Sequence, residues 1–346
     1  VVELGVSIKG SHECPQLALM REENAVADGE ITIAQEASAV LLARRYRDGE
    51  VLWRDLALLW PRLHVLPFHL VLQTTRADGS RTLALMNPRT RTILAEARWP
   101  HATPPARLFD SSETFVASSK TGFVALRKGH AVVGKTGASG SFAPDRLRIF
   151  SLAREGGRLI LRSMKLSKNA ATPATTPPFF LGAGARFHGA FRDTKGKLTH
   201  LEIKVRRWHP DIAYAWRTTG PWTVRRFAPR AAGDRGYEPS FDGEQVFSPL
   251  PLWLSPDFIA QLGRRGEANI GKIGFTLEGR SYHRLRRFSG AERPGKPIDV
   301  PVWVISRKGT SERLWVAPHG DRPMVLKAEK RGGLFYLASV VLPPAK

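Results

Sequence analysis

Residues 68–86 read FHLVLQTTRADGSRTLALM and give the clearest indication of the fold class. Both ends of this stretch are rich in Val, Leu and Thr, and short apolar runs of this kind are typical of β-strands. Between them, Ala77-Asp78-Gly79-Ser80 is a turn signal. Two strand-like runs on either side of such a turn predict an antiparallel hairpin.

Similar runs follow at short intervals: RTILAEA, TFVASS, FVALRKG, HAVVGK, LRIFSLA and RLILRSM. The chain has 346 residues, of which 42% are hydrophobic, so it can bury a sizeable core; its 31 glycines and 25 prolines favour many short elements. We therefore predict a mainly β, multidomain protein of antiparallel sheets, preceded by a small α-rich N-terminal segment.

Residues 1–60 hold the best helical signals. Ser11 can cap a helix with Pro15 in its first turn. The segment 33–47, IAQEASAVLLARRYR, has helix-compatible spacing and ends at Asp48-Gly49. The alternative is a hairpin that turns at Asp48-Gly49, with strands at Val40–Tyr46 and Val51–Leu56. We favour a helix for residues 33–43 and leave both readings open after that.

Composition also suggests where the chain divides. The sequence TPATTPP at 172–178 is the clearest linker, because a run of Pro and Thr does not sustain the interior of a strand or helix. We therefore predict a β domain at 61–171 and a second antiparallel β domain at 179–346. One short helix is expected at Pro256–Gly263.

A threefold repeat runs through the first β domain, in which an apolar strand, a turn and a Leu-x-Leu or Val-x-Leu strand recur. The first strands are Phe68–Thr75, Thr114–Ser118 and Leu147–Leu152, and the second strands are Leu83–Leu85, Val124–Leu126 and Leu159–Leu161. This pattern resembles the β-trefoil of the fascin and lectin kind, and the resemblance covers about 64–175. A Greek-key sandwich is the alternative.

The last hundred residues alternate like strands, as in ERLWVAP at 312–318 followed by GDRPMVLKAE at 320–329. This region resembles the curved antiparallel sheets of bacterial envelope carrier proteins of the lipoprotein-carrier type. The resemblance implies a periplasmic or extracellular protein. The first residues, VVELGVSIKG, carry neither an initiator Met nor a signal-peptide pattern, which is compatible with a processed chain from which an export signal was removed. A cytoplasmic location is the alternative.

Local motifs point to neither a cofactor nor a metal. GHAVVGKT at 129–136 satisfies the phosphate-loop pattern, but the Gly- and Ser-rich residues 137–144 are a poor start for the helix that this chemistry needs. We interpret the motif as a β-turn. A single cysteine, Cys14, and histidines without paired spacing do not predict a metal centre. No apolar stretch reaches the length that spans a bilayer.

Charge is the strongest functional signal. The formal net charge is +22, although residues 1–50 carry five basic and nine acidic side chains. Between 204 and 230, arginines alternate with tryptophans, a combination suited to pairing with anionic groups and stacking on rings. Tyr282 with the arginines at 284–287 repeats it. The predicted ligand-binding residues are Arg206, Arg207, Trp208, Trp216, Trp222, Arg225, Arg226, Arg286 and Arg287. On a regular strand, Arg206 and Trp208 share one face and Arg207 points to the other.

These observations predict a non-catalytic protein that binds an anionic ligand, either an acidic glycan or a lipid headgroup. The alternative is a nucleic-acid-binding protein that uses the same Arg- and Trp-rich face. A hydrolase is the third hypothesis, based on Trp208-His209-Pro210-Asp211 and on the carboxylates of Asp242 and Glu244. We expect binding rather than catalysis.

Overall fold

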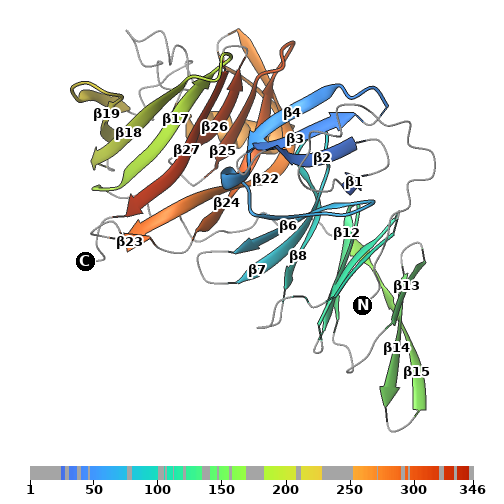
Figure 1. The fold of residues 1–346 in the computed structure, drawn as a ribbon. Helices are drawn as coiled ribbons and strands as arrows, with labels where there is room; N and C mark the ends of the chain where they lie inside the picture. The colour runs from blue at the N-terminus through green and yellow to red at the C-terminus, as the bar shows by residue number, and fades with distance from the viewer. Residues whose placement is uncertain are drawn as a thin grey trace.

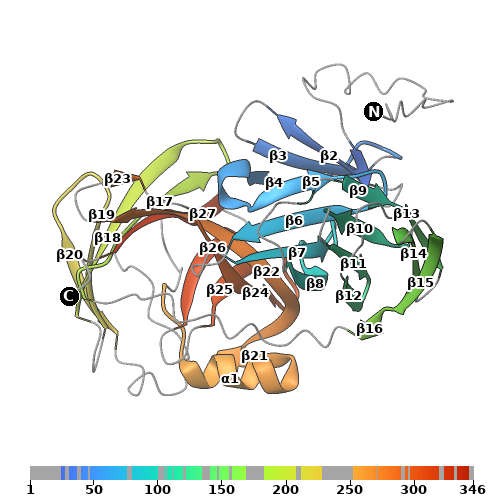
Figure 2. The same cartoon turned by 90° about the horizontal axis from the view of Figure 1, so that it is seen from below.

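The computed structural model is mainly β, with several antiparallel sheets and one α-helix in its described part (Figures 1 and 2). None of its helices is long and apolar enough to cross a membrane. The structure describes residues 25–27, 31–36, 40–45, 47–75, 80–99, 105, 107–111, 113–119, 122–134, 141–145, 148–155, 158–168, 183–207, 212–227, 252–270, 272–289, 293–294, 297–318, 323–330 and 333–342. The mainly β fold class is confirmed, and the predicted domain boundaries stay predictions because the linker at 172–178 lies outside these residues.

The first sheet is an antiparallel meander of four strands. They are β1 (Ala25–Ala27), β2 (Ile31–Glu36), β3 (Val40–Arg45) and β4 (Val51–Leu56), followed by a short 3₁₀ helix at Ala57–Leu59. The helix favoured for residues 33–43 is therefore wrong, and the alternative hairpin is confirmed. The predicted helix that starts at Ser11 lies outside the described residues.

The pattern of burial explains this outcome. Ile31, Ile33, Leu41 and Ala43 are all buried in one cluster, and they recur at every second position, which is the period of a strand. Gly49 has φ of 71°, a left-handed conformation that suits the turn between β3 and β4. Tertiary packing thus overrides the helix-compatible spacing of this segment.

Three more meanders follow in chain order. The second sheet contains β5 (Arg62–Val65), β6 (Leu70–Thr75), β7 (Arg81–Met86) and β8 (Ile93–Trp99). The third contains β9 (Arg107–Asp110), β10 (Phe115–Ser118), β11 (Phe123–Arg127) and β12 (His130–Gly134), with β16 (Ser167–Lys168) at its edge. The fourth contains β13 (Ser141–Asp145), β14 (Arg148–Glu155) and β15 (Arg158–Lys165).

The threefold repeat therefore reflects successive meanders. Its second strands lie in β7, β11 and β15, each the third strand of a separate sheet. The structure gives no support to the trefoil resemblance, because a trefoil would bring the three units into one shared barrel. The phosphate-loop motif is likewise a strand and turn as far as it is described. Gly129 (φ 72°) forms the turn between β11 and β12, and residues 130–134 are strand.

The remaining strands form one large sheet in two parts. On one side lie β17 (Arg186–Asp193), β18 (Leu198–Arg207), β19 (Ile212–Arg217) and β20 (Thr223–Phe227), which we call the outer sheet. On the other lie β21 (Glu267–Ile270), β22 (Ile273–Ser289), β23 (Arg293–Pro294), β24 (Ile298–Arg307), β25 (Arg313–Ala317), β26 (Met324–Lys330) and β27 (Gly333–Leu342). Figure 1 shows the outer sheet in yellow-green beside the orange and red strands.

Strand β27 joins these two parts. Along its length it pairs with β17 on one side, and on the other side with β26 near its start. Its end, from Ser339 to Leu342, pairs in parallel with Arg286–Ser289 of β22. Because β22, β24, β25 and β26 are neighbours in that order, the parallel pairing closes these four strands and β27 into a ring, which we call the barrel.

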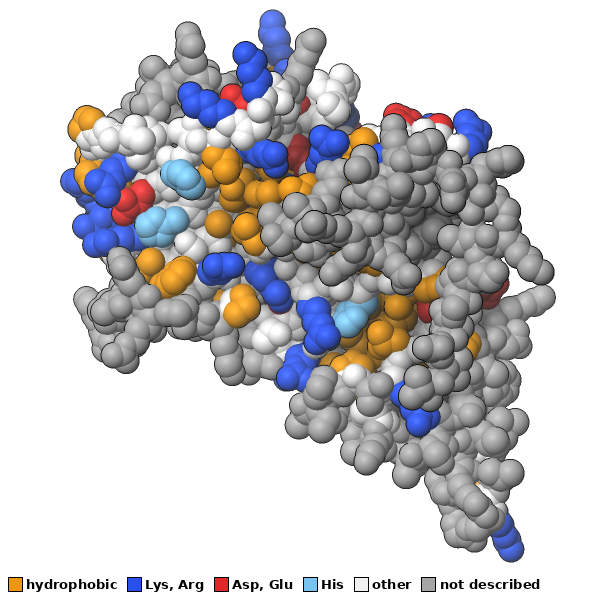
Figure 3. Space-filling view, in the orientation of Figure 1, with side chains coloured by type: hydrophobic (Ala, Val, Ile, Leu, Met, Phe, Trp, Pro, Cys, Tyr) orange, Lys and Arg blue, Asp and Glu red, His pale blue; other side chains and the backbone are white. Residues whose placement is uncertain are grey.

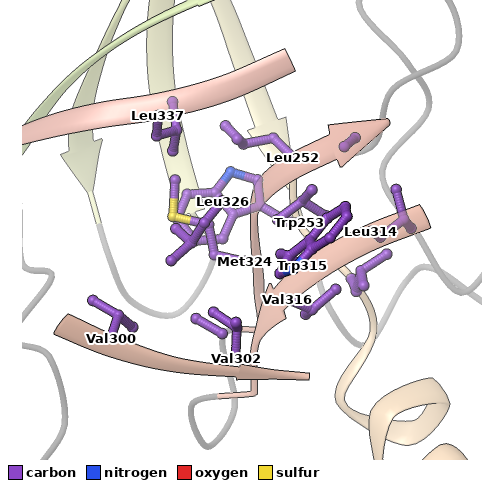
Figure 4. Packing of buried hydrophobic residues seen from close by; sticks show 14 of the residues in the cluster. Leu252, Trp253, Val300, Val302, Leu314, Trp315, Val316, Met324, Leu326 and Leu337 are labelled. Carbon is purple, nitrogen blue, oxygen red and sulfur yellow. The ribbon is translucent and has the colours of Figure 1, made fainter. Parts of the chain in front are cut away.

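The largest core cluster fills the barrel and extends beneath the outer sheet. Figure 4 shows Trp253, fully buried, among Leu252, Met324, Leu326 and other side chains of the cluster. Helix α1 (Pro256–Arg265) covers this core from below in Figure 2 and buries Phe258, Ile259 and Leu262. The short helix predicted for Pro256–Gly263 is therefore confirmed.

A buried group of charges joins the first two sheets to the barrel. Arg91 donates two hydrogen bonds to Glu329, both 2.5 Å long, and lies 3.6 Å from Asp55. Lys327 contacts Asp55 directly and lies 3.2 Å from Glu329. The ring of Trp315 lies against both cations, 4.7 Å from the Arg91 guanidinium and 3.9 Å from the Lys327 ammonium. We call Asp55, Arg91, Lys327 and Glu329 the junction cluster.

Candidate anion-binding face

The outer sheet has one buried and one exposed face. Phe187, Ile203 and Trp216 point into the core, and the residues on either side of each along the strand point outward. Because paired residues on neighbouring strands point to the same side of a sheet, the pairing register identifies which outward side chains lie together.

One row of outward residues crosses five strands. Arg286 of β22 pairs with Ser339, Ser339 with His188, His188 with Glu202, and Glu202 with Arg217. The next row places Arg186 opposite Lys204. Cations from three distant segments of the sequence are therefore neighbours on one surface.

A β-bulge adds two more cations to this surface. The register between β18 and β19 shifts between Val205 and Arg207, and Arg207 then pairs with Ala213. Ala213 lies on the same side of β19 as Arg217, so Arg207 belongs to the outward face. Arg206 and Arg207 are both exposed. The expectation that Arg207 points away is wrong, because a bulge reverses the alternation that a regular strand would keep.

We call the outward cations of this region the basic face. Its members are Arg186, Lys204, Arg206, Arg207, Arg217 and Arg286. Figure 3 shows Lys and Arg side chains at the margin of the molecule over β18 and β19, next to two histidines and an acidic side chain. The concentration of like charge gives this surface a positive potential that attracts anions.

A hollow of about 260 Å³ opens on the basic face. Its lining residues are His188, Gly189, His200, Leu201, Glu202, Arg217, Thr218, Thr219 and Gly220. Arg217 donates two hydrogen bonds to Glu202, of 2.9 Å from Nε and 2.7 Å from Nη2. On its other side, the Arg217 guanidinium lies 4.5 Å from the ring of Trp222. These contacts hold Arg217 in place, and its side chain is still 43% exposed.

The hollow has more donors than acceptors to offer a ligand. Glu202 is 18% exposed and already pairs with Arg217. His188 and His200 are exposed residues, and Thr218 and Thr219, each with a hydroxyl that can donate, also line the hollow. Within the described part of the chain, neither imidazole makes a hydrogen bond, nor does Nη1 of Arg217. An anion is the ligand that this arrangement suits.

The predicted site residues fall into four groups. Arg206, Arg207, Trp222 and Arg286 belong to the surface just described. Trp216 does not, because it is 2% exposed and packs in the core cluster. The backbones of Arg225 and Arg226 pair with Tyr214 and Ala213, and that of Arg287 pairs with Val340, but their side chains are not described. Trp208 lies outside the described residues.

Sequence reasoning missed the histidines and Arg186. Arg186 and His188 lie in RFHGAFRD and His200 lies in LTHLEIKVRR, and both segments alternate apolar and polar residues as a half-exposed strand should, which was the available signal. Its position beside β18 and β27 depends on pairing between segments far apart in the chain, and no local pattern reveals that.

A pair of a histidine and a carboxylate lies in the N-terminal sheets. Nδ1 of His69 is 2.5 Å from Asp110, whose other oxygen accepts the N–H of Phe68 at 2.7 Å. This pair links the loop before β6 to β9, and among the described residues no hydroxyl or thiol joins it. Nor do three His, Cys, Asp or Glu side chains come together as a metal site in that part of the chain. The residues of the hydrolase hypothesis, at 208–211, 242 and 244, lie outside the described residues.

No protein-family model and no curated protein matches this sequence. Among solved structures, the chain is similar to the crystal structure of BamB from Moraxella catarrhalis, with 11% identity, a TM-score of 0.25 and coverage of 89% of this chain and 82% of that one. It is also similar to the WD40 domain of SCAP from fission yeast, with 9% identity, a TM-score of 0.19 and coverage of 94% of this chain and 56% of that one. The description of the site rests on its own geometry.

Proposed function

We propose that this protein binds an anionic ligand, an acidic glycan or a lipid headgroup, without chemical conversion, and that the basic face is its binding surface. The observation that carries the proposal is the register that brings Arg286, Arg186, Lys204 and Arg217 onto one surface around a donor-rich hollow. Such ligands are components of cell envelopes, and we extend the proposal to a periplasmic or extracellular location.

Nucleic acid is the alternative ligand, and the charge favours it equally. Proteins that bind single-stranded nucleic acid without preference for its base sequence use several aromatic side chains, on which successive bases stack. On the described part of the basic face, Trp222 is partly exposed but has the Arg217 guanidinium against its ring, and Trp216 is buried. This arrangement favours a ligand recognised by charge and hydrogen bonds over one recognised by stacking.

The test is a binding comparison at low and high salt. Heparin-like glycan, anionic liposomes, single-stranded DNA and duplex DNA are each measured at about 50 and about 300 mM salt, because purely electrostatic binding falls steeply over this range. The wild type is compared with Arg186→Ser/Lys204→Ser/Arg206→Ser. The matched control is Arg264→Ser/Arg265→Ser/Lys272→Ser, which removes three exposed cations at and after the end of α1.

We expect glycan or liposome binding to survive the higher salt, to be lost in the basic-face variant and to be kept in the control. Selective retention of nucleic acid would establish the alternative ligand class. Equal weakening in both triple variants would show that the charge is a general surface property, and the proposed site would be wrong.

A further inference from the structure

The hollow on the basic face presents its free donors from separate elements. His188 comes from β17, His200 from β18, and Arg217 with Thr218 and Thr219 from the end of β19 and the turn that follows. At about 260 Å³, the hollow has room for one small group and not for an extended chain. A polymer or membrane could therefore contact it through a single projecting group.

The donor geometry distinguishes a tetrahedral oxyanion from a carboxylate. A planar carboxylate is best bound by two parallel donors of one guanidinium. On Arg217 the Nε–Nη2 edge already faces Glu202, and both atoms donate to it. The remaining donors, Arg217 Nη1, two imidazoles and two hydroxyls, come singly from different sides. This arrangement suits a phosphate group, whose oxygens accept hydrogen bonds from several directions.

We propose that this hollow binds one phosphate group of the anionic ligand, and that protonation of His188 and His200 strengthens its binding. The inference rests on the proposed function and specifies which chemical group enters the hollow. A neutral imidazole donates one hydrogen bond, whereas an imidazolium donates from both nitrogens and adds a positive charge.

The strands around the two histidines carry charged side chains, with the exception of β27. Arg186 and Arg192 lie on β17, Glu202 and Lys204 on β18, Arg217 on β19 and Arg286 on β22. Strand β27 contributes Ser339 to the row. These fixed charges attract the anion at any pH, and the histidines add the part that depends on pH.

The test measures binding of inorganic phosphate and glucose 6-phosphate by calorimetry between about pH 5.5 and pH 8 at constant ionic strength. Inorganic sulfate, which stays fully charged over this range, separates protonation of the protein from that of the ligand, because glucose 6-phosphate has a second pKa of about 6 and inorganic phosphate also takes up a proton within the range. Vesicles containing phosphatidic acid test the lipid source of the same group. The variants are His188→Gln/His200→Gln and, as a control on β12, His130→Gln.

For the wild type we expect sulfate, whose charge does not change, to bind more tightly at pH 5.5 than at pH 8. The double variant should weaken sulfate binding about tenfold or more at pH 5.5 and much less at pH 8, while His130→Gln behaves as wild type. Tight binding of phosphatidic acid vesicles, with weak binding of glucose 6-phosphate, would identify a lipid as the source of the group.

Two results would overturn the inference and leave the proposed function intact. In the first, glycan or liposome binding depends on Arg186, Lys204 and Arg206, but phosphate does not bind. In the second, phosphate binds, but the histidine substitutions leave its binding unchanged at every pH. If the wild type binds neither the polyanions nor phosphate, both proposals are wrong.

Discussion

At the scale of single residues, the burial of His283 makes the stability of the fold depend on pH. Its ring is 1% exposed, and its Nε2–H donates to the carbonyl of Leu337 at 2.7 Å. The pKa of His283 is lowered to about 4, chiefly by desolvation and also by the charge of Lys327, against the opposing effects of the hydrogen bond to Leu337 and the charge of Asp55. Between pH 6.5 and 4 the unfolded chain therefore binds a proton that the folded chain does not.

The first prediction concerns this proton. Acidification from pH 6.5 to 4 should cost the wild type about 3 kcal/mol of unfolding free energy through His283 alone. His283→Gln keeps a donor for Leu337 but cannot titrate, so its stability should change much less over this range. Urea unfolding at several pH values measures the difference.

His130→Gln, at a partly exposed position, is the control and should keep the wild-type pH dependence. Below pH 4.5 all three proteins should lose stability together. The cations Lys327 and Arg91 hold the pKa of Glu329 at about 2, so this carboxylate is protonated more readily in the unfolded chain. The prediction would be contradicted if, above pH 4.5, the free energy of unfolding changed with pH by the same amount in the wild type and in His283→Gln.

At the scale of elements, the close contact between β17 and β27 depends on glycines, of which Gly189 is one and Gly333 another. A Cβ at Gly189 would lie 2.2 Å from the carbonyl oxygen of Tyr336 and 3.0 Å from the side chain of Leu337. The backbone of β27 cannot move away without loss, because its other edge pairs with β26 and β22. Gly189 therefore sets the spacing of the strands that carry His188 and Ser339.

The second prediction is that Gly189→Ala lowers the free energy of unfolding by about 2 kcal/mol or more, as expected when a side chain is forced into a packed interior. Gly220→Ala is the matched control. Gly220 lines the same hollow, but a Cβ at this position would have nothing within 4 Å, so its substitution should change stability by less than about 0.5 kcal/mol. Equal effects of the two substitutions on chemical denaturation would refute the role of Gly189.

The strands themselves could largely be predicted from the sequence, and their partners could not. The hairpin around 68–86 forms as predicted, in β6 and β7, because its pairing is local. The outward row from Arg286 to Arg217 depends on contacts between segments that only the complete sheet brings together. The reversal at Arg207 depends on a bulge, and no residue type in Val205–Arg207 marks one. Trp216 is buried because alternation on β19 directs it inward.

At the scale of the whole molecule, the junction cluster connects the first two sheets to the barrel. Asp55 follows Trp53 on β4, Arg91 lies in the turn before β8, and Lys327 and Glu329 lie on β26. Asp55 and Lys327 are nearly inaccessible, with side chains 1% and 3% exposed. Two positive and two negative groups balance, so removing one member leaves an uncompensated buried charge.

The third prediction follows from that balance. Asp55→Asn should destabilise the protein by about 3 kcal/mol or more, because Lys327 then remains buried without its nearest partner. Asp55→Leu combined with Lys327→Met removes both charges and leaves the Arg91–Glu329 pair intact, so it should restore most of the lost stability. Thermal and chemical unfolding measure both variants. A double variant less stable than Asp55→Asn would show that the pair contributes more than charge balance.

The central position of β27 has a consequence for how the chain folds as it is synthesised. The first four sheets pair mostly neighbouring segments and can form soon after they leave the ribosome. The barrel closes through β27, which also joins the outer sheet to it, and β27 is the last of the described strands to be translated. Until it emerges, β17, β22 and β26 have unpaired edges, which are templates for incorrect association. We therefore expect the row of outward residues from Arg286 to Arg217 to be assembled last.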